Sequence, residues 1–165
     1  RCFFMVREHA VHPFAPVWDA QCRVLVLGSF PSVRSREVGF YYGHPQNRFW
    51  RLMERLYGQP VPPEPDGRRA YVLSHGVALW DVLAACDIMG SSDASIRRAV
   101  PNDLPALLAR GGVERIFCNG QRAYALYMRY LDAACNLPVK ALPSTSAANA
   151  AWSLDRLTDA WRTIL

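Results

Sequence analysis

The run Cys22-Arg-Val-Leu-Val-Leu-Gly28 constrains the fold more than any other segment of the chain. It is apolar at nearly every position, rich in valine and leucine, and ends at a glycine. A strand with one face in water would alternate apolar and polar residues. This pattern is instead typical of a strand buried on both faces of a parallel sheet. Further short apolar runs follow, and we expect strands at 77–80, 114–118 and 138–142.

Helical patterns alternate with these strands. Residues 47–57 carry apolar side chains at helical spacing and end at Gly58, which is typical of an amphipathic helix with a glycine C-cap. The other expected helical segments are 67–75, a turn at 81–86, about 102–110, 121–134 and 148–165. Such alternation predicts an α/β fold, a three-layer α/β/α sandwich around a central, mainly parallel four-stranded sheet. The length favours one domain, 1–165, with 1–11 as a flexible N-terminal segment.

The composition allows one sizeable core and shows no membrane anchor. Hydrophobic residues make up 51% of the 165 positions, and no apolar run approaches the roughly 20 residues that span a bilayer. The first residues are too few and too weakly apolar for a secretory signal, and Met5 is a candidate initiator. We therefore expect a cytoplasmic protein.

Cysteines and histidines form no metal-binding pattern in the sequence. The five cysteines are scattered without a Cys-x-x-Cys pair, which disfavours zinc ribbons and iron–sulfur clusters. In a reducing compartment such cysteines remain buried free thiols. The four histidines complete no ligand set either. We expect no metal and no cofactor.

The charge balance is compatible with a polyanionic partner. The formal net charge is +5, and arginine accounts for all but one of the 19 basic residues. Arginine forms bidentate contacts to phosphate better than lysine does. An arginine-rich bias of a GC-rich genome would give the same count, so charge alone does not establish nucleic-acid binding.

Ligands of open parallel sheets bind at the carboxyl ends of the strands. That rule selects three loops, 28–47, 119–121 and 142–149. The most unusual residues of the chain lie in these loops. The sequence therefore predicts a site where the three loops meet.

Strings in these loops resemble a known family. Leu27-Gly-Ser-Phe-Pro-Ser32 and Gly39-Phe-Tyr-Tyr-Gly-His-Pro-Gln-Asn-Arg-Phe-Trp50 are similar to the first motif of the uracil-DNA glycosylase superfamily. Ile116-Phe-Cys-Asn-Gly120 and Leu142-Pro-Ser-Thr-Ser-Ala-Ala-Asn149 extend the likeness, which covers nearly the whole chain. The branch that the strings resemble most is that of hypoxanthine-DNA (deoxyinosine) glycosylases, relatives of the mismatch-specific uracil enzymes.

The resemblance implies that an aromatic ring stacks on a base flipped out of the duplex. Extruding a base costs a few kcal/mol, and stacking on an aromatic side chain returns about 1–3 kcal/mol. Tyr42 aligns with the stacking residue of the family. Phe40 and Tyr41 are alternatives if the loop register differs, and all three rings could instead pack the core.

Two positions depart from the common pattern of the superfamily. Phe30 stands where relatives carry a carboxylate or asparagine that orients water, and Leu142 stands where they carry a histidine or asparagine that bonds the base carbonyl. Both departures are typical of the hypoxanthine branch. The resemblance implies that in this branch asparagines take over these two roles, here Asn47 and Asn119. Their amides can hold a water molecule or bind the edge of a purine. Asn47 is equally suited to cap the helix that follows it.

Further roles follow from the resemblance. The expected base-binding residues are Ser29, Phe30, Pro31, Tyr42 and His44, and the expected DNA-backbone contacts are Ser144, Thr145, Ser146 and Ala147. His44 could instead brace its loop, and the serine-rich segment could be an ordinary helix entry. Asp81 and Asp93 could activate water, although capping is the commoner role of aspartate.

The sequence thus predicts a monomeric, monofunctional glycosylase that excises a deaminated base, hypoxanthine above all, from double-stranded DNA. Glycosylases that also cut the backbone need a nucleophilic amine, and the single lysine, Lys140, lies inside an expected strand. The alternatives are a mismatch-type uracil or thymine glycosylase, a lesion-binding module with weak catalysis, and a domain that binds free nucleotides. No glycine-rich phosphate loop supports the last of these.

Overall fold

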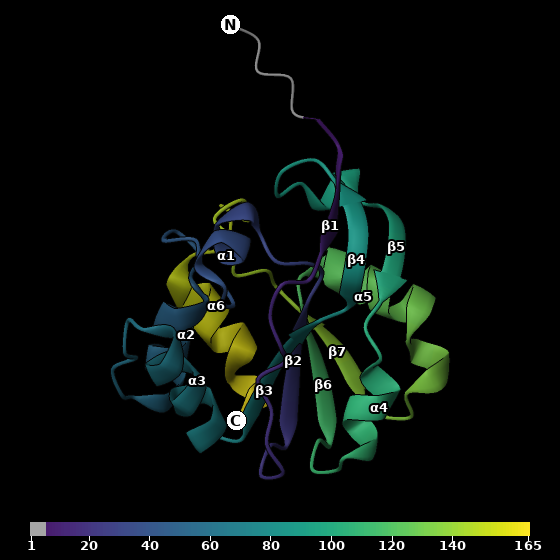
Figure 1. Cartoon of the computed structure of the whole chain (residues 1–165). Coiled ribbons are helices and arrows are strands. Elements are labelled where there is room, and N and C mark those ends of the chain that lie inside the picture. Colours follow the sequence, from purple (N-terminus) through teal and green to yellow (C-terminus); the bar gives the residue numbers. More distant parts are fainter. Residues whose placement is uncertain (1–5) are drawn as a thin grey trace, which may run out of the picture.

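A parallel four-stranded sheet forms the centre of the computed structural model, which describes residues 6–165 (Figure 1). The strands are β2 (Val24–Gly28), β3 (Val77–Asp81), β6 (Arg115–Asn119) and β7 (Val139–Leu142). Their order in the sheet is β3-β2-β6-β7, and every neighbouring pair is parallel. All five residues of β2 are buried. The expected parallel sheet is confirmed.

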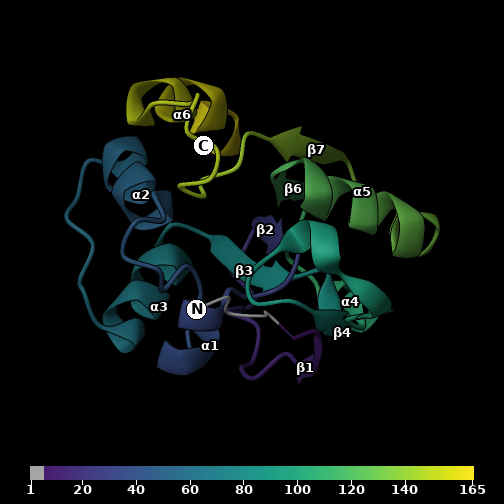
Figure 2. The same ribbon diagram turned by 90° about the horizontal axis from the view of Figure 1, so that it is seen from above.

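Helices cover both faces of this sheet, as Figure 2 shows from above. Because side chains alternate along a strand, β2 supplies both cores. Val24 and Val26 face a core with α2 (Phe49–Tyr57), α3 (Pro65–Ser74) and α6 (Leu154–Trp161), whereas Leu25 and Leu27 face a core with α4 (Leu104–Ala109) and α5 (Gln121–Tyr130). The three-layer α/β/α sandwich is confirmed.

A second, antiparallel sheet lies beside the first. It consists of β1 (Glu8–Val11), β4 (Leu83–Ile88) and β5 (Arg97–Pro101) in the order β1-β4-β5. The helical turn expected at 81–86 is therefore wrong, because pairing of β4 on both edges overrides the helix propensity of its alanines. The flexible segment expected at 1–11 is also wrong for residues 8–11, which pair with β4. Residues 1–5, with the candidate initiator Met5, lie outside the described residues.

Helix boundaries differ by a few residues from the sequence prediction, most of all in the last helix, and one helix was not predicted. The last helix begins at Leu154 rather than at 148, because Ser153 is its N-cap and accepts a hydrogen bond from the Arg156 N–H. An unexpected short helix, α1 (Val33–Val38), lies in the loop after β2. Ser32 caps its start and Gly39, in the left-handed region with φ 73°, ends it. Short 3-10 turns at Asp93–Ser95, Asp132–Ala134 and Arg162–Ile164 complete the elements.

Among residues 6–165 no helix is long and apolar enough to cross a membrane. The same residues hold no group of three or more histidine, cysteine or acidic side chains placed to bind a metal. The four cysteines within this range, Cys22, Cys86, Cys118 and Cys135, are buried free thiols.

Candidate active site

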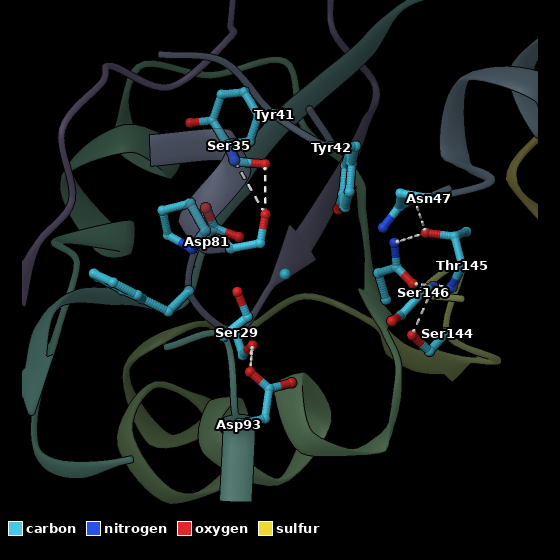
Figure 3. Close-up of a pocket in the computed structure, with 16 residues that line it drawn as sticks. Ser29, Ser35, Tyr41, Tyr42, Asn47, Asp81, Asp93, Ser144, Thr145 and Ser146 are labelled. Carbon is cyan, nitrogen blue, oxygen red and sulfur yellow. Dashed lines mark hydrogen bonds between the residues drawn. The ribbon is translucent and has the colours of Figure 1, made fainter. Parts of the chain in front are cut away.

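A pocket of about 150 Å³ opens where the four parallel strands end (Figure 3). Its walls come from the loop after β2, from the end of β3, from the end of β6 and from the loop after β7. The three loops selected from the sequence therefore meet, and the end of β3 and the segment between β4 and β5 add two further contributions. The lining residues are Gly28, Ser29, Phe30, Pro31, Ser32, Ser35, Tyr41, Tyr42, Asn47, Asp81, Ser91, Asp93, Asn119, Ser144, Thr145 and Ser146.

A buried histidine–aspartate pair stands behind one wall of the pocket. His12 Nε2 lies 2.7 Å from Asp81 Oδ2, and the two side chains are only 4% and 5% exposed. His12 follows β1 and is enclosed by the rings of Phe14, Phe30 and Tyr41. Because Asp81 is the last residue of β3 and lines the pocket, the histidine fixes a carboxylate whose other oxygen remains an acceptor.

Gly28 makes room for that carboxylate. It pairs in register with Asp81 across β2 and β3, and a β-carbon at position 28 would overlap Asp81 Oδ1. The same β-carbon position lies 3.6 Å from the Tyr42 hydroxyl oxygen. The glycine that ended the apolar run in the sequence thus lets two polar groups approach the sheet at one point.

Tyr42 forms another part of the wall. Its ring stacks on Phe49 with centroids 4.1 Å apart and an interplanar angle of 25°, which leaves the opposite face for a second ring. Its backbone is in the left-handed region at φ 53°, which is rare for a residue with a side chain. The buried Tyr42 hydroxyl has no hydrogen-bond partner among residues 6–165. Burial, followed by the negative charge of Asp81, raises the pKa of Tyr42, and the nearby Asn119 amide lowers it; burial dominates, so the hydroxyl stays a donor.

The alternatives Phe40 and Tyr41 have other contacts. Tyr41 is 2% exposed, packs edge-on against Phe14 and donates its hydroxyl to the Ala15 carbonyl at 3.0 Å. Phe40 stacks on Trp50. Of the three neighbouring aromatic residues, Tyr42 is thus the one with a free ring face and an unpaired hydroxyl at the pocket.

Thr145 joins the two asparagines of the opposite wall. Its hydroxyl accepts from Asn119 Nδ2 at 3.0 Å and donates to Asn47 Oδ1 at 2.9 Å. Its backbone N–H donates to Asn119 Oδ1, also at 3.0 Å. Thr145 is fully buried, so its side chain cannot contact phosphates as expected, and we assign it a positioning role.

Asn47 stands one residue before Arg48, the N-cap of α2, and its amide both accepts from the first N–H of that helix and presents a donor. Its Oδ1 accepts from the Phe49 N–H at 2.9 Å, at the start of α2, as well as from Thr145. Two donors on Oδ1 fix the orientation of the amide. The Nδ2 group then has no hydrogen-bond partner within residues 6–165 and is a donor at the pocket (Figure 3). Asn119, by contrast, uses both ends of its amide to hold Thr145.

The remaining residues expected at the site fall into two groups. Phe30, Pro31, Ser144 and Ser146 line the pocket, with Ser144 and Ser146 partly exposed. Ala147 and His44 do not line it and are exposed. His44 Nδ1 accepts from the Gln46 N–H at 3.1 Å, which is the bracing contact considered from the sequence.

Arg48 holds the loop that carries the two serines. Its guanidinium donates to the carbonyls of Trp152, Ser146 and Asn149, and its backbone N–H donates to the Thr145 carbonyl. This arginine binds backbone rather than phosphate. The loop after β7 is therefore fixed against the start of α2.

Ser29 and Asp93 form a third polar pair. The Ser29 hydroxyl donates to Asp93 Oδ1 at 2.7 Å. Burial raises the pKa of Asp93, the hydrogen bond from Ser29 lowers it, the charge of Asp81 raises it and that of Arg122 lowers it, with burial dominant. Asp93 is thus a carboxyl group that ionises with more difficulty than an aspartate in water.

We expect Asp93→Asn to stabilise the protein at neutral pH. At acid pH, a carboxyl whose pKa is raised by folding is protonated in both the folded and the unfolded state. It then does not lower the free energy of unfolding. As pH rises above the ordinary aspartate range, the folded state bears a penalty for the buried charge, which the amide avoids. Thermal unfolding from pH 4 to pH 7 should show a variant advantage that grows with pH. A constant or shrinking difference would contradict the prediction.

The sequence alone does not predict that His12 and Asp81 form a pair at the site. Asp81 follows an expected strand directly, so the rule of strand ends could have included it. Nothing in the sequence links position 12 to position 81, because the contact depends on β1 joining the second sheet.

Comparisons with known proteins find relatives that cover most of the chain. Residues 15–165 match the family model of the uracil DNA glycosylase superfamily. A protein named hypoxanthine DNA glycosylase from Methanosarcina acetivorans is 33% identical over 155 residues, 92% of this chain and 95% of its own. One of the same name from Methanosarcina barkeri is 31% identical over 140 residues, 82% and 86% of the two chains.

A solved structure shares the fold as well. The solution NMR structure of a Methanosarcina acetivorans protein, described as a candidate uracil DNA glycosylase, superposes with a TM-score of 0.78. Its sequence is 31% identical, and the match covers 92% of this chain and 93% of that one.

Proposed function

The chain belongs to the uracil-DNA glycosylase superfamily and is a DNA glycosylase, and we propose that it excises hypoxanthine, the deamination product of adenine, from double-stranded DNA. Hydrolysis of the N-glycosidic bond would leave an abasic site. We further propose that residues 1–165 act as one glycosylase domain and as a monomer.

The buried acceptor Asp81 is the observation that supports a deaminated purine. Hypoxanthine carries an N–H at position 1, where adenine has a bare nitrogen lone pair. The fixed Asp81 carboxylate, deep in the pocket, would accept a hydrogen bond from that N–H and repel the adenine lone pair. Sites built to bind an N–H discriminate strongly against an analogue that lacks it, since a buried polar group is then left unpaired. Tyr42 would stack on the base through its free face.

Asn47 would act on the leaving base. As the bond from C1′ to the base breaks, its electron pair passes to the base, and water adds to C1′. The proton that the water releases ends on the base, which departs neutral. The fixed Nδ2 donor of Asn47 would stabilise the negative charge that develops on the base during this step. Thr145 and Asn119 would act as positioning residues, because they hold the Asn47 amide.

Two features support the remaining parts of the proposal. Ser144 and Ser146 are partly exposed at the pocket, on a loop fixed by Arg48, and are suited to contact phosphates of the flipped nucleotide. Lys140 lies within β7 and is not a lining residue. No lysine is among the residues that line the pocket, where it could form a Schiff base, and this supports a monofunctional enzyme.

Cleavage of end-labelled duplexes tests this function. Duplexes that contain hypoxanthine, uracil or no lesion would be incubated with the enzyme and treated with or without alkali. We expect strand cleavage of the hypoxanthine duplex after alkali alone and no borohydride-trapped adduct. Cleavage without alkali, or a trapped adduct, would contradict the monofunctional mechanism.

The other outcomes of this assay select the alternatives. Uracil presents an N–H beside a carbonyl as hypoxanthine does, so cleavage of the uracil duplex alone would identify a mismatch-type enzyme. Selective binding of a lesion without any cleavage would identify a lesion-binding module and would point to Phe30, which cannot orient water.

A further inference from the structure

A basic groove lies between β5 and α5, and none of its lining residues lines the pocket. Figure 1 shows this strand and this helix side by side, and the groove between them has a volume of about 490 Å³. Its floor is apolar, with Ile96 and Leu126 buried in the core. Its walls carry four exposed arginines. They are Arg97, Arg98, Arg122 and Arg129.

The positive charge of this groove is largely uncompensated. No acidic residue is among those that line it. In the chain from residue 6 onward, Arg122 and Arg129 take part in no salt bridge. Arg98 approaches Asp87 at 3.6 Å, but its side chain is 85% exposed, so that pair is weak. Arg97 donates to the carbonyls of Ala94 and Ile96 and has no acidic partner within residues 6–165.

The spacing of the arginines suits a nucleic-acid strand. Arg122 and Arg129 are seven residues apart on one face of α5, which is about 10.5 Å along the helix axis. Phosphates of one strand of duplex DNA are spaced about 3.4 Å apart along the duplex axis, so the two arginines span about three nucleotides. Arginine also binds phosphate oxygens bidentately.

The groove begins next to the pocket. Arg122 lies in the first turn of α5, three residues after Asn119, and its charge lowers the pKa of Asp93 in the pocket. The first turn of α5 holds no acidic residue and has no side-chain cap, so its N–H groups add positive potential there. A strand whose flipped nucleotide occupies the pocket would therefore pass the groove.

The backbone conformation of Arg98 is a separate indication that the groove has a function. Within residues 6–165 only Tyr42 and Arg98 are non-glycine residues with positive φ, at 53° and 49°. Such strain costs on the order of 1 kcal/mol and is concentrated at functional sites. One of the two strained residues is the stacking residue of the pocket, and the other lies on the wall of the basic groove.

We propose that the groove between β5 and α5 binds the DNA backbone beside the lesion, through Arg97, Arg98, Arg122 and Arg129. This inference rests on the proposed function for its partner, duplex DNA. It assigns to the duplex a second contact surface on the side of the pocket opposite α2 and α3. Affinity for the flanking duplex would come from the groove, and selection of the base would come from the pocket.

The double variant Arg98→Gln/Arg129→Gln tests the groove without touching the pocket. We expect its affinity for an undamaged duplex to fall about tenfold at moderate salt, because two phosphate contacts are lost. The slope of log Kd against log salt, measured by fluorescence anisotropy, should decrease in magnitude by about two. The single-turnover excision rate at saturating enzyme, where binding no longer limits it, should equal that of the wild type.

The matched control is Arg23→Gln/Arg162→Gln, which removes the same charge far from the groove. Both arginines are exposed and each faces one carboxylate. We expect the salt slope of this control to stay near that of the wild type. An unchanged slope in the groove variant, or an equal change in the control, would overturn the proposal.

The two proposals can fail separately. If the wild type excises hypoxanthine while the groove variant keeps its affinity and slope, the groove inference is wrong and the function stands. If the wild type excises no lesion but binds duplex through the groove, the groove inference stands and the proposed reaction is wrong.

Discussion

Asn47→Ala should lower the single-turnover rate of hypoxanthine excision by about 10²–10³-fold, the usual cost of removing one fixed donor to developing negative charge. The wild-type amide is held by two hydrogen bonds to Oδ1, from Phe49 and from Thr145, so in the proposed mechanism Nδ2 would meet the leaving base without reorganisation. Alanine removes the donor and leaves a pocket that still admits the base. The rate should be measured at saturating enzyme, where binding does not limit it.

The variant Asn47→Asp removes the Nδ2 donor but keeps an oxygen that can accept from the start of α2. The carboxylate keeps an oxygen that accepts from the Phe49 N–H, and a negative charge is favourable at the start of α2. We expect this variant to unfold at or near the wild-type temperature and yet lose activity as strongly as the alanine variant. Retention of more than about a tenth of the wild-type rate would show that Asn47 serves only to accept from the start of α2, since a fixed donor is worth far more.

His12→Leu should lower the free energy of unfolding by about 3–5 kcal/mol, because it leaves the Asp81 carboxylate buried without its partner. For a domain of this size that corresponds to a fall in Tm of about 6–20 °C. The reason lies in the burial of the pair, with side chains 4% and 5% exposed. Differential scanning calorimetry measures both quantities.

The chain supplies a matched control three residues earlier. His9 Nδ1 lies 2.9 Å from Asp87 Oδ1, but the two side chains are 62% and 19% exposed. An exposed pair contributes at most about 1 kcal/mol, so His9→Leu should have a small effect. Equal losses in the two variants would show that the His12–Asp81 pair has no special role in stability.

The parallel sheet could be predicted because its signals are local. The apolar run before Gly28 already indicates burial on both faces, and the strand-end rule places the pocket loops. The antiparallel sheet could not be predicted, because β4 holds alanines and a cysteine that suit a helix equally well. Its strand structure comes from pairing with β1 and β5, segments distant in the sequence.

The candidate site likewise has parts that local sequence predicts and parts that depend on contacts between distant residues. Asn47, Asn119 and Tyr42 could be proposed from their strings, since each lies in a recognisable loop. The part played by Thr145 could not, because its hydroxyl joins residues 98 and 26 positions away. A serine-rich loop suggests exposure and phosphate contacts, and only the packing of the loop after β7 against α2 shows that the threonine is buried.

The position of His12 bears on where the functional unit of this protein starts. The family match begins at residue 15, three residues after the histidine that holds Asp81. A fragment cut at that boundary would keep every strand of the parallel sheet, yet it would lose β1 and the partner of the acid in the pocket. Expression fragments that start where the family match starts would therefore discard the residue that holds the Asp81 carboxylate.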